Sequence, residues 1–221
     1  MNLQLCIPYQ KCPFKCPMCI ASGRPTYENL YKENTDLYLR RLTDLIEGYD
    51  IEDIVLTGNT DPTLDRNWLR IVTNEIKENY NLPIEIQTKN YNLKGYNLSQ
   101  IDVLAYSITS VKDYLKAWQF RKIPRTNRLV ILLTKEFDFL TADNFNAFGF
   151  DQITFKVLQE GADLEQNKWV QDNAMTDLSN IYDIVNRFNG TDISVRIDTN
   201  CQDSENRYVI YREDANVYKE W

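Results

Sequence analysis

The chain has 221 residues, 43% of them hydrophobic and 26% charged, which is the composition of an ordinary globular protein of one large or two small domains. The chain has only seven glycines and seven prolines, which excludes collagen-like and low-complexity chains. It has no long apolar run, which excludes a membrane span. The net charge of −7 argues against general nucleic-acid binding, and the complete lack of histidine excludes Ser-His-Asp catalysis, Cys-His catalysis and histidine-ligated zinc.

Short runs with strand character alternate with helical periods along the chain. The predicted strands are 3–8, 51–57, 83–88, 102–109, 128–134, 152–158 and 193–197. The predicted helices are one capped by Thr35 or Asp36, one starting at Asp65, 111–120, 141–148, and one with an apolar stripe from Leu178 to Phe188. This alternation is typical of parallel βαβ units.

The number of units limits the architecture. Six or seven units are too few for a complete eight-unit barrel, which typically has about 250 residues. The sequence therefore predicts an α/β fold, either a partial barrel or an open doubly wound sheet. The tail from 207 to 221 carries two short strand-like runs around a turn at 213–215, which predicts a hairpin-like extension.

The number and spacing of the five cysteines indicate that the protein works in a reducing compartment. They are Cys6, Cys12, Cys16, Cys19 and Cys201, an odd number with four of them clustered near the N-terminus, unlike a secreted disulfide framework. The first residues show no signal-peptide pattern. We therefore expect a cytoplasmic protein with reduced thiols.

Three cysteines directly follow the first predicted strand. Cys12, Cys16 and Cys19 have the spacing C-x-x-x-C-x-x-C, in the loop position where parallel barrels build their sites. Thiolates are the soft ligands of zinc and of iron–sulfur clusters, and three of them leave one iron of a four-iron cluster open. A structural zinc site that recruits Cys6 is the alternative, although such sites usually join two separated ligand pairs.

This motif, in a chain of β/α repeats, resembles that of the radical SAM superfamily. Residues 54–64 resemble the family's Gly-Gly-Glu-Pro-like turn after the second strand, with one residue inserted and Asp61 in place of Glu. The resemblance implies a partial (β/α)6-type barrel over 1–200, with residues 201–221 as a C-terminal extension packed on the same domain. It also implies one [4Fe-4S] cluster, held by Cys12, Cys16 and Cys19, that reductively cleaves S-adenosylmethionine (SAM). A 5′-deoxyadenosyl radical then abstracts hydrogen from the substrate.

The resemblance further implies contacts to SAM near the cysteines. Met18 stands where the family usually has an aromatic residue that touches adenine. The turn Gly58, Asn59, Thr60 and Asp61 would meet the SAM amino group through backbone carbonyls and the Asp61 carboxylate. Asp61 as a simple turn or helix cap is the alternative.

Later strands supply further candidates by position. Thr88 and Asn90 resemble residues near the SAM carboxylate or ribose, Ser107 resembles a ribose contact, and Lys156 could face the site. Thr88 and Ser107 as ordinary strand-end polar groups, and Lys156 as a snorkelling side chain, are the alternatives. Cys201 is either a passive thiol or a hydrogen donor to a substrate radical, as in radical epimerases, and with no later cysteine we expect no auxiliary cluster.

The sequence thus predicts a radical SAM enzyme that acts on a small-molecule or nucleotide-like substrate and takes electrons from an external reductant such as flavodoxin or ferredoxin. The enzymatic alternatives are a peptide-modifying radical SAM enzyme and a glycyl-radical activase. The non-enzymatic alternative is a structural metal or electron-transfer module. The acid-rich segment 160–177 is either a substrate lid or a solvated loop and helix.

Overall fold

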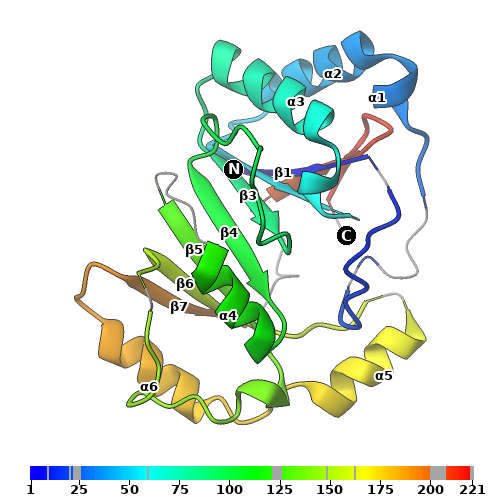
Figure 1. Ribbon diagram of the computed structural model, residues 1–221. Coiled ribbons are helices and arrows are strands. Elements are labelled where there is room, and N and C mark those ends of the chain that lie inside the picture. Colours follow the sequence, from blue (N-terminus) through cyan, green and yellow to red (C-terminus); the bar gives the residue numbers. More distant parts are fainter. Residues whose placement is uncertain are drawn as a thin grey trace.

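The computed structural model describes residues 1–8, 10–19, 21, 26–58, 60–120, 126–147, 149–161, 163–199 and 208–219. Nine strands form one sheet in the order β7-β6-β5-β4-β3-β2-β1-β8-β9 (Figure 1). The strands are β1 (Asn2–Cys6), β2 (Asp53–Thr57), β3 (Ile84–Thr88), β4 (Val103–Ile108), β5 (Thr126–Leu133), β6 (Gln152–Val157), β7 (Ser194–Asp198), β8 (Tyr208–Tyr211) and β9 (Val217–Tyr218).

The sheet is parallel from β7 through β1 to β8, and only β9 runs antiparallel to its neighbour β8. Strands β1 to β7 are neighbours in the order in which they occur along the chain. The predictions of an α/β fold, of seven parallel strands and of a C-terminal hairpin are confirmed. The sequence did not predict that β8 would pair in parallel with β1.

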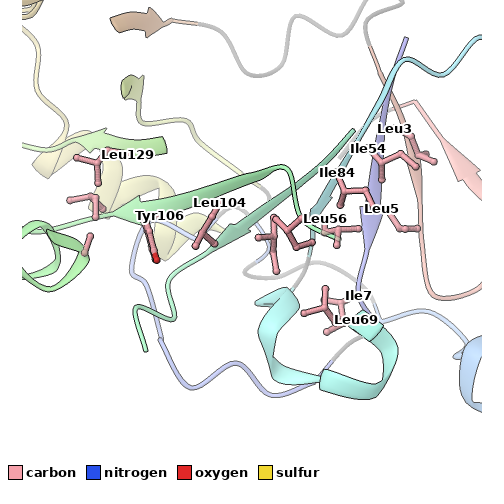
Figure 2. Packing of buried hydrophobic residues seen from close by; sticks show 14 of the residues in the cluster. Leu3, Leu5, Ile7, Ile54, Leu56, Leu69, Ile84, Leu104, Tyr106 and Leu129 are labelled. Atoms are coloured by element: carbon pink, nitrogen blue, oxygen red, sulfur yellow. The ribbon is translucent and has the colours of Figure 1, made fainter. Parts of the chain in front are cut away.

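The two faces of the sheet differ in polarity because side chains alternate along each strand. One face carries fully buried aliphatic residues that stack from strand to strand, such as Leu5, Leu56 and Leu104 (Figure 2). The opposite face carries polar groups, including an ion pair between Arg128 and Glu85. The first face forms the main hydrophobic core, and the second remains available to build a site.

The helices are α1 (Leu30–Glu33), α2 (Thr35–Gly48), α3 (Arg66–Asn79), α4 (Val111–Phe120), α5 (Leu164–Asn173) and α6 (Ser179–Phe188), with 3-10 turns η1 (Pro62–Leu64) and η2 (Lys135–Phe137). Helices α2, α3, α4 and α6 form where the sequence predicted helices. Asp65 caps α3 as predicted, but the cap of α2 is Asn34, whose side chain accepts from the Leu37 amide at 3.0 Å. None of the helices in these ranges is long and apolar enough to cross a bilayer.

The helix predicted over 141–148 is wrong. Its described residues form a turn followed by an irregular segment. The Asn144 side chain accepts from the Thr141 amide at 2.8 Å and donates to the Phe139 carbonyl at 2.7 Å. One helical turn closes, because the Asn144 and Phe145 amides donate to the Thr141 carbonyl at 3.2 and 3.0 Å. The helix does not continue, and the Ala142 carbonyl accepts from the Arg187 guanidinium of α6 instead of from a further turn.

The C-terminal hairpin is bound into the fold at several points. The Tyr211 hydroxyl donates to the Tyr38 carbonyl of α2 at 2.7 Å. The guanidinium of the buried Arg212 lies 4.9 Å from the ring centre of Tyr27 and 5.0 Å from that of Tyr218. The hairpin therefore holds the segment that leads from the cysteine loop into α1.

Candidate functional site

A cavity of about 230 Å³ opens at the carboxyl ends of β2 to β6, beneath the loop that follows β1. This is the edge of a parallel sheet at which ligands usually bind. The residues that line it are Cys12, Phe14, Cys16, Met18, Cys19, Thr57, Gly58, Thr60, Asp61, Pro62, Gln87, Lys89, Ser107, Thr109, Val130, Leu132, Lys156, Val157, Leu158 and Gln159.

All three motif cysteines line this cavity as free thiols. The loop turns tightly, with the Cys19 amide donating to the Cys16 carbonyl at 3.1 Å and Lys15 in the left-handed region at φ 44°. Burial raises the pKa of the Cys16 thiol. Lys89 opposes that shift by its charge and a hydrogen bond, while the nearby thiols of Cys19 and Cys12 add to it.

The thiols line one cavity but do not form a preformed metal site. Among the residues that the structure describes, no three His, Cys, Asp or Glu side chains are arranged to hold a metal ion. The donor chemistry nevertheless fits an iron–sulfur cluster, because three thiols reach one cavity and thiolates are the ligands that such clusters use.

Helix α5 fastens the cysteine loop to the sheet. Met18 is buried and packs with Leu158 and Val170 in a small apolar cluster separate from the main core. The buried Gln166 donates from Nε2 to the Gln159 carbonyl at 3.1 Å and to the Met18 carbonyl at 3.4 Å. Figure 1 shows the dark blue loop after β1 descending to the yellow α5. Part of segment 160–177 therefore packs against the loop instead of being wholly solvated.

The turn after β2 approaches β1 closely at Gly58. Its φ is +128°, and a Cβ built there would lie 2.9 Å from the Cβ of Cys6. Only glycine fits this combination of backbone angle and space. Gly58, Thr60 and Asp61 all line the cavity, whereas the predicted Asn59 lies outside the described residues.

The Asp61 carboxylate is enclosed by protein donors. Its Oδ1 accepts from the Thr63 amide at 3.0 Å and from the Thr63 hydroxyl at 2.7 Å. Its Oδ2 accepts from the Lys89 amide at 2.7 Å, and the Thr88 hydroxyl lies within 2.9 Å of both oxygens. Asp61 thus caps η1, as predicted by the alternative in which it is a turn or helix cap. Its hydrogen bonds also connect the turn to the end of β3.

Thr88 and Asn90 lie behind the cavity wall. Thr88 bonds to Asp61, and the Asn90 side chain donates to the Thr63 hydroxyl at 3.1 Å. Their neighbours Gln87 and Lys89 line the cavity instead. The alternation of β3 contained this signal, since Ile84 and Ile86 mark the core side and the odd-numbered positions must then face the other way.

Lys89 is a site residue that sequence reasoning missed. Its ammonium bonds to the Thr109 hydroxyl and lies 3.1 Å from Oδ2 of Asp113. Burial acts to raise the pKa of Asp113, but the hydrogen bonds from Thr109 and Lys89 and the Lys89 charge outweigh it and lower that pKa. Lys89 therefore reaches the cavity as a cation that the protein has already paired.

Ser107 and Lys156 both line the cavity. The backbone carbonyl of Ser107 accepts a hydrogen bond from the Tyr91 hydroxyl at 2.6 Å, which fixes the end of β4. Cys201 lies outside the described residues. Cys6 is fully buried against Gly58 and is not among the lining residues, so it lies apart from the three motif thiols.

No protein-family model matches this chain, and no curated protein sequence matches it. Its function is therefore inferred from the motif, the strand order and the cavity.

Proposed function

We propose that the protein is a radical SAM enzyme. The observation that carries the proposal is that Cys12, Cys16 and Cys19 line the same cavity as the Gly58–Asp61 turn. These two segments are separated by nearly forty residues in the sequence. Each resembles a cofactor-binding segment of one superfamily, and the fold brings them to one edge of a parallel sheet.

We also propose that the sheet is a partial barrel of the (β/α)6 type. Support comes from the strand order, since β1 to β7 follow each other in sequence and in space. In an open doubly wound sheet the order reverses at a switch point, which is not seen between β1 and β7. Residues 201–221 remain the proposed extension.

In this proposal Cys12, Cys16 and Cys19 hold a [4Fe-4S] cluster. When bound, the cluster supplies the electron that cleaves SAM. Met18 and the apolar cluster around it exclude water from one side of the cavity. Because the Asp61 carboxylate is occupied by protein donors, we assign contact with the SAM amino group to the backbone carbonyls of the turn. Ser107, near the end of β4, supplies a hydroxyl to the cavity lining.

The zinc alternative finds no support at the site. A four-cysteine site would need Cys6, which is fully buried and packed against Gly58, outside the cavity lining. A cytoplasmic location and an external one-electron donor such as flavodoxin or ferredoxin are proposed as the setting, since the motif thiols are free and the cluster must be reduced.

Anaerobic reconstitution with iron and sulfide, followed by dithionite and SAM, tests the proposal. We expect wild-type protein to form 5′-deoxyadenosine, detected by chromatography, and Cys16→Ala to lose both the cluster absorbance and the product. Cys6→Ala is the matched control, because it removes a thiol of the same segment outside the cavity and should retain both. Product from Cys16→Ala, or a fully loaded wild-type protein that neither binds nor cleaves SAM, would contradict the proposal.

A further inference from the structure

The cavity has two ends with different chemistry. At the β2–β3 end lie the Gly58–Asp61 turn and the paired cation Lys89. At the β5–β6 end lie the apolar residues Val130, Leu132, Val157 and Leu158, the polar Gln159, and one charged residue, Lys156. Strands β2 and β6 are four spacings apart in the sheet, which is about 19 Å measured along it.

Lys156 differs from Lys89 in its pairing. Lys89 is neutralised by Asp113, whereas Lys156 makes no ion pair and no hydrogen bond within the described part of the chain. Its register neighbour on β7 is Asp198. Lys156 is only partly exposed, so an anion that reaches it in the cavity meets less competition from water than on an open surface.

The apolar wall limits what this anion can be attached to. Val130 is a buried residue of the neighbouring strand β5, Leu158 is buried just after the end of β6, and Leu132 lies in register with Lys156. A fully hydrated inorganic ion gains nothing from such a wall. A molecule with an apolar body and one anionic group can contact the aliphatic side chains and pair with the ammonium at the same time.

We propose that Lys156 recognises the carboxylate or phosphate of a small substrate whose apolar body packs on Val130, Leu132 and Leu158. The assignment of this ligand as the substrate rests on the proposed function. The binding of an anion by Lys156 does not depend on that function. The SAM carboxylate is the other source of the same chemistry, and the second arm of the experiment below distinguishes the two sources.

Calorimetric titration of the full chain with phenyl phosphate, benzoate and neutral benzyl alcohol tests the proposal. We expect wild type to bind at least one anionic probe more tightly than the alcohol. Lys156→Met should weaken that binding about tenfold or more, since a hydrogen bond to a charged group is lost, while Lys156→Arg should retain most of it. Lys94→Met, which removes the same charge from an exposed loop, should bind as wild type does.

Equal affinity of wild type for the anionic and neutral probes, or unchanged binding in a folded Lys156→Met, would overturn the proposal. A second arm titrates reconstituted protein with SAM and with 5′-methylthioadenosine, which lacks the carboxylate. Unchanged SAM affinity in Lys156→Met supports the substrate assignment. Selective loss of SAM affinity overturns it and assigns the anion to SAM. Formation of 5′-deoxyadenosine is measured separately, so that failure of the radical chemistry is distinguished from failure of anion binding.

Discussion

The residue with the narrowest steric requirement in the site is Gly58. Its backbone angle is one that side chains rarely adopt, and its Cα faces Cys6 with no room for a methyl group. The close approach brings the β2 turn against the strand that leads into the cysteine loop. The geometry of the cysteine loop and of the β2 turn is therefore coupled through a contact that a single methyl group would break.

We expect Gly58→Ala to lower the free energy of unfolding by about 2–5 kcal/mol, from backbone strain plus overpacking. Gly190→Ala is the matched control, because Gly190 has φ +78° but a Cβ added there would meet nothing within 4 Å, so it isolates strain of about 1 kcal/mol. Urea unfolding measures both. Equal losses in the two variants would contradict the close contact.

A second prediction at the residue scale concerns pH and Asp113. Its pKa is lowered in the folded protein from the usual value of 3.8, so the unfolded chain binds its proton first as the pH falls. The stabilisation by Asp113 is therefore complete above about pH 5 and is lost as the pH falls below 4, through the lowered pKa.

Asp113→Asn checks this sign. We expect the variant to be less stable than wild type at pH 6, and the difference in free energy of unfolding to shrink between pH 5 and pH 3. Asp177→Asn is the comparison, since the pKa of Asp177 is also lowered, but by hydrogen bonds from Ser179 at an exposed turn and not by Lys89. A difference that grows as the pH falls would exclude the Lys89–Asp113 pair as its source.

At the scale of elements, α5 decides how firmly the cysteine loop is held. The loop contacts the rest of the protein through the small cluster of Met18, Leu158 and Val170 and through Gln166. These contacts join residues nearly 150 positions apart in the sequence. Because the cluster is separate from the main core, the loop can loosen without unfolding of the sheet.

We expect Gln166→Leu to increase the rate at which iodoacetamide modifies Cys16, measured by mass spectrometry of the modified peptide. The substitution removes the bonds to the Met18 and Gln159 carbonyls and leaves buried backbone groups unsatisfied. Gln171→Leu is the control, because Gln171 is exposed on the same helix and bonds only to Glu160 in the described chain. Equal rates for wild type and Gln166→Leu would mean that α5 does not restrain the loop.

At the scale of the whole molecule, the C-terminal hairpin completes the sheet beyond β1. Strand β8 pairs with β1 in parallel, and Val209, Ile210 and Tyr211 are buried. Without β8, the backbone of β1 would become an unpaired edge beside the cysteine loop, which is a hazard for aggregation. The hairpin is thus part of the sheet on which the candidate site is built.

A chain that ends at Thr199 should lose on the order of 5 kcal/mol of stability, from the apolar burial of three large β8 side chains alone. That is comparable to the total stability of many domains, so we expect a lower urea midpoint together with aggregation. A chain that ends at Ala215 keeps β8 and should retain most of the stability. The same urea midpoint for the Thr199 and full-length chains would show that β8 is dispensable.

The sequence by itself predicted the class of fold and the core of the site. Alternation of strands and helices depends on local periodicity, and the cysteine spacing depends on neighbouring residues, so both are visible in a linear pattern. The failed helix over 141–148 shows the limit, because the Ala142 carbonyl bonds to Arg187 of the distant helix α6 instead of to a further helical turn. Even the side of β3 that faces the cavity was encoded, in the alternation of Ile84 and Ile86.

Only the tertiary structure decided which polar groups are already satisfied. The sequence could not tell that the Asp61 carboxylate is used to join two loops, that Asp113 neutralises Lys89, or that Lys156 remains unpaired in the described chain. It could not place β8 beside β1 or α5 against Met18 either. These facts depend on contacts between distant segments, whose register and distance are fixed only when the sheet assembles and the helices pack on it.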